Sequence, residues 1–188
     1  MAVYVAGLVL FLGIHALPML QSTRGRILAA WGEGRYKLAY SLLAIAGLVL
    51  IVLGWRAAGP GPQLFAPSPL AIRVAPFVMI AVFILLASSH APAHLRAAVR
   101  HPMLIAVMLW SIVHLFANGD TRGTILFAAF LGWALVDLVS VVRRRAVATF
   151  EPRWRADLIA IVAGTLIALL VMTFHRVLFG PAVVPFSV

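Results

Sequence analysis

Long apolar runs separated by short arginine-bearing segments constrain this chain more than any other feature of its sequence. The runs cover residues 2–20, 38–55, 72–88, 102–117, 123–142 and 156–174, and the fourth is the shortest. A helix needs about 20 apolar residues to cross the ~30 Å hydrocarbon layer of a bilayer, and backbone in lipid must satisfy its own hydrogen bonds. The sequence therefore predicts an all-α fold, a polytopic membrane helix bundle of about six transmembrane helices in a single domain over residues 1–188.

Composition excludes the soluble alternatives. Apolar residues make up 64% of the chain and charged residues 11%, whereas soluble domains are about half apolar and a quarter charged. The formal net charge is +10, which in a soluble protein would raise the question of nucleic acid. Here the basic residues stand between apolar runs, so no nucleic-acid partner is expected and the lipid bilayer is the predicted surrounding.

The distribution of basic residues predicts the orientation. The odd-numbered loops hold Arg24, Arg26, Arg35, Lys37, Arg96, Arg100, Arg143, Arg144, Arg145, Arg153 and Arg155, whereas Arg56, Arg73, Arg122 and Arg176 fall on the other side. Positive loops stay in the cytoplasm, so both termini are predicted to lie outside. The positive flank of the first run follows it, which favours a retained helix over a cleaved signal peptide.

Loops and small residues lead to further expectations. The Pro/Gly-rich segment 59–69 is expected to be irregular and solvated, and Asn118 and Gly119 are expected to end the fourth helix through left-handed geometry. Small residues four apart, which let helices approach closely, recur in two helices and are expected to serve packing. They are Ala128 and Gly132 in the fifth helix, and Ala160, Gly164 and Ala168 in the sixth.

Ionisable side chains inside the spans are the first candidates for function, because lipid makes them costly. They are His15, His114 and Asp137. Asp137 would either reach Arg144 or accept a proton from His15, which would orient that imidazole. Each histidine would otherwise be a hydrogen-bonded packing residue.

Other histidines are weaker candidates. His90 and His94 have the spacing of a two-histidine metal face, but Pro92 lies between them and no acidic or thiol ligand accompanies them, so their role stays open. His101 precedes Pro102 and is expected at a helix entry. His101 and His114 are about 19 Å apart along one helix and cannot share an iron. The chain has no cysteine, which excludes thiolate ligands, and no phosphate loop, catalytic triad or zinc motif is present.

The segment from His101-Pro102-Met103 through Leu109-Trp110 to His114-Leu115-Phe116-Ala117-Asn118-Gly119-Asp120 resembles the NnrU family. Gly34-Arg35-Tyr36 and Leu131-Gly132-Trp133 are also similar. The resemblance covers about residues 1–145, which leaves the C-terminal helix at 156–179 as an addition. It implies a bacterial inner-membrane protein with periplasmic termini, linked to nitrogen-oxide metabolism and denitrification.

The family is related to the heme b-containing ζ-carotene isomerases. That kinship implies that His15 and His114 would ligate heme iron, although their depths differ by about 10 Å on ideal helices and some tilt would be needed. Trp110 shares the face of His114, and His101 and Asp137 would handle protons or orient a ligand. The isomerases have a cysteine where this chain has Ser111, so ligand switching through sulfur is not expected.

Three functions remain open from the sequence. The first is heme b binding in nitrogen-oxide metabolism, with a small gas or hydrophobic ligand as partner. The second is heme-dependent cis–trans isomerisation of a polyene such as ζ-carotene. The third is a cofactor-free helper in membrane assembly or transport, although the chain lacks the paired repeats of typical transporters.

Overall fold

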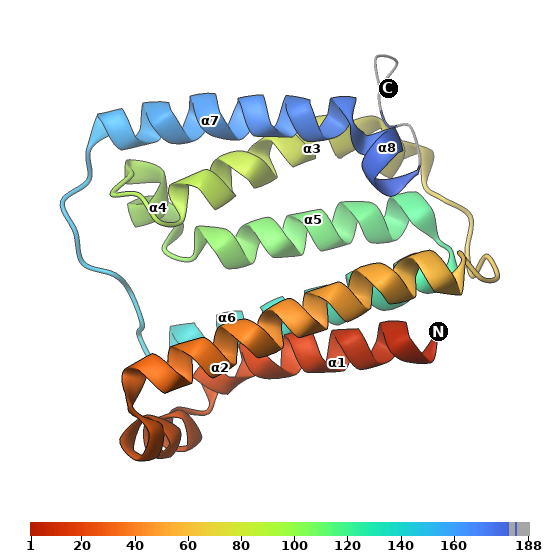
Figure 1. Ribbon diagram of the computed structural model, residues 1–188. Helices are drawn as coiled ribbons and strands as arrows, with labels where there is room; N and C mark the ends of the chain where they lie inside the picture. Colours follow the sequence, from red (N-terminus) through yellow and green to blue (C-terminus); the bar gives the residue numbers. More distant parts are fainter. Residues whose placement is uncertain (181–182, 184–188) are drawn as a thin grey trace.

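The computed structural model describes residues 1–180 and 183 and is built from helices (Figure 1). In chain order they are α1 (Ala2–Ala16), the 3-10 helix η1 (Leu17–Met19), α2 (Gln21–Ala58), α3 (Pro69–Ser88), α4 (His94–Val99), α5 (Pro102–Asn118), α6 (Thr121–Arg143), α7 (Trp154–Thr173) and α8 (His175–Phe179). The all-α prediction is confirmed.

Six of these helices have the character of membrane spans. Five helical stretches, Ala2–Met19, α2, α3, α6 and α7, are long and apolar enough to cross a bilayer, and α5 is a shorter apolar helix of 17 residues. Large apolar side chains point away from the bundle, among them Phe77, Val136 and Ile159 with 73%, 61% and 66% of their surfaces exposed. Such surfaces suit lipid rather than water, so the prediction of a multi-pass membrane bundle with a short fourth span is confirmed.

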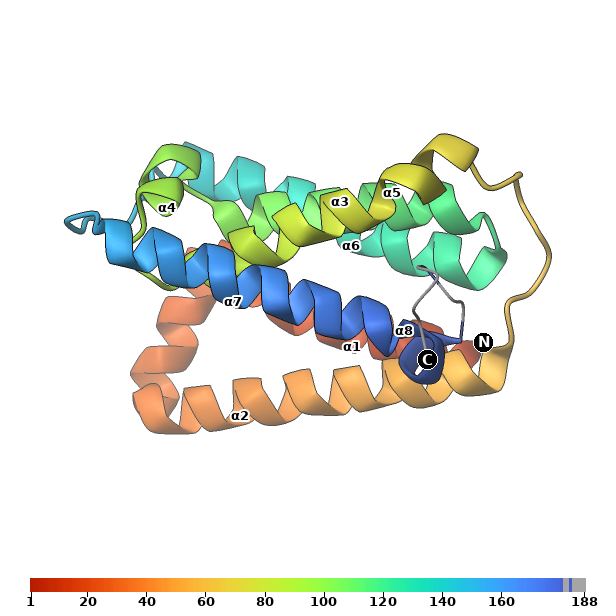
Figure 2. The ribbon, with the colours of Figure 1, turned by 90° about the horizontal axis from the view of Figure 1, so that it is seen from above.

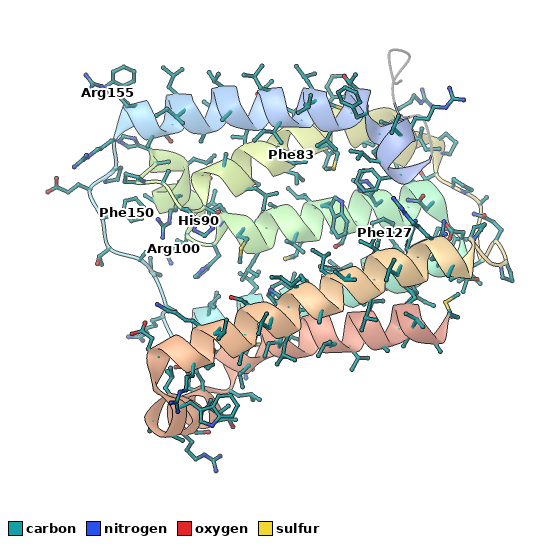
Figure 3. All side chains as sticks on the ribbon, viewed as in Figure 1. Phe83, His90, Arg100, Phe127, Phe150 and Arg155 are labelled. Carbon is teal, nitrogen blue, oxygen red and sulfur yellow. The ribbon has the colours of Figure 1, made fainter. Side chains whose placement is uncertain are left out.

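The bundle consists of two groups of helices joined through α5 (Figure 1). α1 packs along α2, while α3 packs against both α5 and α7, and α5 also packs on α6. We call the end that holds the N-terminus, residues 59–68 and α8 the terminus end. The opposite end, where Figure 3 labels His90, Arg100 and Arg155, is the arginine end. The basic loops thus gather at one end, as the topology prediction requires.

Small residues bring helix backbones into contact at two interfaces. A Cβ at Gly47 of α2 would lie 2.8 Å from the backbone nitrogen of Phe11 in α1, and one at Gly164 of α7 would lie 2.6 Å from Cα of Ile84 in α3. Ala160 and Ala168 are buried on the same face of α7 as Gly164. The packing role expected for this stripe is confirmed.

The pair of small residues in α6 does not face another of the described helices. Ala128 and Gly132 are exposed, and a Cβ at Gly132 would meet no atom within 4 Å. The packing expected for this pair is therefore not found within the described part of the chain. Small-residue spacing permits close approach but does not choose the face that a helix buries.

The first basic loop is largely helical. α2 begins at Gln21, well before the second span, and its helix is broken at Gly32, where φ is 74°. Figure 2 shows the part before the break running in a different direction from the rest of α2. Glycine allows this break because positive φ carries no Cβ penalty.

The segment 59–68 is irregular, as expected, but its backbone is not simply solvated. The amide of Leu64 donates to the carbonyl of Gly119 at 2.8 Å, and the amide of Thr121 donates to that of Pro62 at 3.0 Å. Gly119 has φ 76° and ends α5 in left-handed geometry, which confirms its predicted role. Residues 60–67 are exposed, as expected for this segment, and the two loops also tie α2, α3, α5 and α6 together at the terminus end.

Candidate functional site

Two apolar cavities lie next to one another at the terminus end. The first has a volume of about 310 Å³ and lies between α3, α5, α7 and α8, with Met79, Phe83, Ala106 and Met172 in its lining. The second, of about 250 Å³, lies between α2, α5, α6 and α8. Both are near the lower end of the ~300–1,000 Å³ range of ligand pockets.

The second cavity has a polar margin. Arg56 and Asn118, at the ends of α2 and α5, line it together with apolar residues such as Ile51 and Leu126. Among the residues that the structure describes, no carboxylate lines either cavity. The site therefore favours a ligand that has an apolar body and a negatively charged edge.

His114 lies at the boundary of the two cavities and contributes to both linings. Its Nδ1 is 2.9 Å from the carbonyl oxygen of Trp110, one turn earlier in α5. Because a carbonyl only accepts, Nδ1 carries a proton, and in the neutral form of the ring Nε2 keeps its lone pair. The rings of Trp110 and Phe127 flank the imidazole, at centroid distances of 5.6 and 5.0 Å. The hydrogen bond at Nδ1 thus orients the His114 imidazole in the way that metal-ligating histidines are oriented.

His15 has the same local arrangement in different surroundings. Its Nδ1 is 2.7 Å from the carbonyl oxygen of Phe11. Its ring stacks on Phe11 at 4.2 Å and meets Tyr40 and Trp133 edge-on. The bond that orients the imidazole thus comes from the helix backbone, not from Asp137.

The structure does not bring His15 and His114 together. His15 contacts Trp133 and His114 contacts Phe127, six residues apart on α6 and so roughly 9 Å along its axis. The rings of Phe11, Phe130 and Trp110 follow one another between the two histidines. A shared iron would need their Nε2 atoms about 4 Å apart. In this packing aromatic rings lie between the two imidazoles, and their pairing on one heme stays a prediction.

The second-tier residues are dispersed. Oδ1 of Asp137 lies 4.0 Å from Nη2 of Arg144. Of the two partners expected for Asp137, Arg144 and His15, the structure therefore shows Arg144. His101 precedes the first residue of α5, as expected for a helix entry. Ser111 is fully buried, and its hydroxyl has no hydrogen-bond partner among the described residues. Of this tier, only Trp110 lines the cavities.

His90 and His94 do not form a metal face. The Nδ1 of His94 is 2.8 Å from Oδ2 of Asp157, and the amides of His94 and Leu95 also donate to that carboxylate. Asp157 thereby connects α7 to the start of α4. No group of three His, Cys, Asp or Glu residues comes together as a metal site in the part of the chain described.

The chain matches the family described as NnrU protein over residues 3–183. It belongs to this family. The match extends past residue 145 through α7 and α8, so the last span is shared by the NnrU family rather than added to it. No curated protein and no solved structure matches the chain.

Some residues of the segment that resembles the NnrU family stabilise the ends of α5 and α6. The Asn118 side chain donates to the carbonyl of His114 at 2.6 Å, and Asp120 caps α6 by accepting from the amide of Gly123. With the turn at Gly119, these residues fix the end of the helix that carries His114.

Sequence reasoning missed His175. This residue begins α8 and lines both cavities. The sixth apolar run predicts a helix that ends at Phe174, immediately before His175, and no spacing rule links His175 to His114. Its only sequence signal is a histidine at the end of a membrane span.

Proposed function

We propose that this chain is a bacterial inner-membrane hemoprotein that serves nitrogen-oxide metabolism, with His114 as a ligand of heme b. The observation that carries the proposal is the geometry of His114: an imidazole whose Nδ1 is occupied by the Trp110 carbonyl, beside two apolar cavities. Heme iron takes histidine as its axial ligand, and the porphyrin supplies the equatorial ones.

The surroundings of His114 fit an apolar macrocycle. Aromatic and aliphatic side chains line both cavities, and Arg56 adds a positive charge at the margin of the second. When bound, heme would supply redox and gas-binding chemistry. The protein's own share is to hold and orient the ligand imidazole and to exclude water.

Absorbance of the purified protein tests the proposal. The chain is expressed in heme-supplied bacteria and purified in detergent, and we expect a Soret band whose pyridine hemochrome identifies heme b. His114→Ala should abolish the band, whereas His90→Ala, which changes an exposed histidine at the arginine end, should leave it intact.

The alternatives give different results. Colourless wild-type protein from heme-replete cells would favour the cofactor-free helper. Conversion of ζ-carotene by reconstituted protein would favour the isomerase.

The nitrogen-oxide role needs a cellular test. A denitrifying strain that lacks its copy of this gene should grow more slowly on nitrite without oxygen, and the wild-type chain should restore growth while His114→Ala should not. Equal rescue by both chains would refute a role for His114.

A further inference from the structure

His175 shares its surroundings with His114. Among the described residues, four line both cavities: Trp110, His114, His175 and Phe179. They form the wall between the two spaces. In contrast to His15, His175 therefore lies at the same end of the bundle as His114.

Each of the two histidines is supported by an aromatic ring on its own helix. Trp110 lies 5.6 Å from His114 on α5, and Phe179 lies 4.9 Å from His175 on α8. In both pairs the partners are four residues apart and share a helix face. α5 and α8 thus place two supported imidazoles beside the same space, although they are distant in the chain (Figure 1).

The linings indicate the chemistry of the occupant. Side chains from α3 and α7 make the first cavity apolar, and Arg56 and Asn118 give the second cavity a polar edge. A flat apolar ring with carboxylates on one edge matches this distribution, and heme b, with its propionates, has that form. Figure 3 shows the side chains that fill the bundle around Phe83 and Phe127, one in the lining of each cavity.

We propose that His114 and His175 are the two axial ligands of this heme, in place of the pair His15 and His114. The inference rests on the proposed function and adds a specific second ligand to it. α8 is only five residues long, so the second ligand is carried on a short element at the end of the last span.

Variants of the three histidines test the inference. Wild type, His15→Ala, His114→Ala and His175→Gly are purified from heme-supplied cells and compared by absorbance and electron paramagnetic resonance. We expect a six-coordinate, low-spin wild type and an unchanged His15→Ala. His175→Gly should retain heme in a high-spin state, and added imidazole should restore the low-spin spectrum. That restoration would also show that the variant is folded, and His175→Gln provides a variant closer in size.

The outcomes separate this inference from the proposed function. Low-spin heme that turns high-spin in His15→Ala but not in His175→Gly or His175→Gln would overturn the inference and leave heme binding intact. A wild type that is already high-spin, with both His175 variants unchanged, would overturn it too. Protein without heme, or with bound zinc or copper instead, would overturn the proposed function itself.

Discussion

Replacing Gly164 by alanine tests the close packing of α7 on α3. The new Cβ would lie 2.6 Å from Cα and 2.7 Å from N of Ile84. These are backbone atoms, so the clash cannot be relieved by rotating a side chain. Gly132→Ala is the matched control, because it makes the same change in another span where no atom lies within 4 Å.

The expected magnitude follows from these contacts. Carbon atoms pack at about 3.5–4.0 Å, so α7 and α3 would have to separate by roughly 1 Å. Overpacking of this kind costs about 1–3 kcal/mol, while the higher helix propensity of alanine offsets up to ~1 kcal/mol in either variant. The two variants should therefore differ by about 2 kcal/mol, the middle of the overpacking range.

Thermal unfolding in detergent, followed by tryptophan fluorescence, measures this difference. At roughly 2–4 °C per kcal/mol for a chain of this size, Gly164→Ala should melt about 4–8 °C below Gly132→Ala. Because α3 and α7 line the first cavity, Gly164→Ala should also retain less heme under the proposed function. Equal melting temperatures would refute the reasoning and show that α3 and α7 can separate without loss of stability.

Three further predictions rest on other parts of the structure. Gly119→Ala should melt below Gly34→Ala, because left-handed geometry at Gly119 costs an alanine about 1–2 kcal/mol and its Cβ would also clash with the backbone oxygen of Phe65, whereas a Cβ at Gly34 meets no atom within 4 Å; equal melting would exclude both costs. Ser111→Ala should leave the melting temperature unchanged or raise it, because an unpaired buried hydroxyl costs about 1–3 kcal/mol; a clear fall would mean that the hydroxyl has a partner. Arg56→Gln should speed heme transfer to a soluble heme acceptor relative to Arg73→Gln, an exposed arginine of α3 outside both linings, and equal rates would remove Arg56 from the site.

The NnrU family segment shows how one stretch of sequence can serve both fold and site. Gly119 and Asp120 shape the turn between α5 and α6, whereas His114, one turn earlier, faces the cavities. A motif in the sequence does not separate these roles. Only the contacts of each side chain show which residues hold the helix end and which are available to a ligand.

The spans, the grouping of basic loops at one end and the turn at Gly119 were predictable from the sequence. Each follows from a local rule: bilayer thickness sets helix length, charge distribution sets orientation, and positive φ at a helix end favours glycine. These rules need no knowledge of which helices are neighbours.

Tertiary packing decided the rest. It selected Gly164 rather than Gly132 as a contact, tied residues 59–68 to the α5–α6 turn, and placed His175 instead of His15 beside His114. In lipid nearly every helix face is apolar, so hydrophobic pattern does not say which face is buried or what it meets. That choice depends on the fit between surfaces that are far apart in the chain.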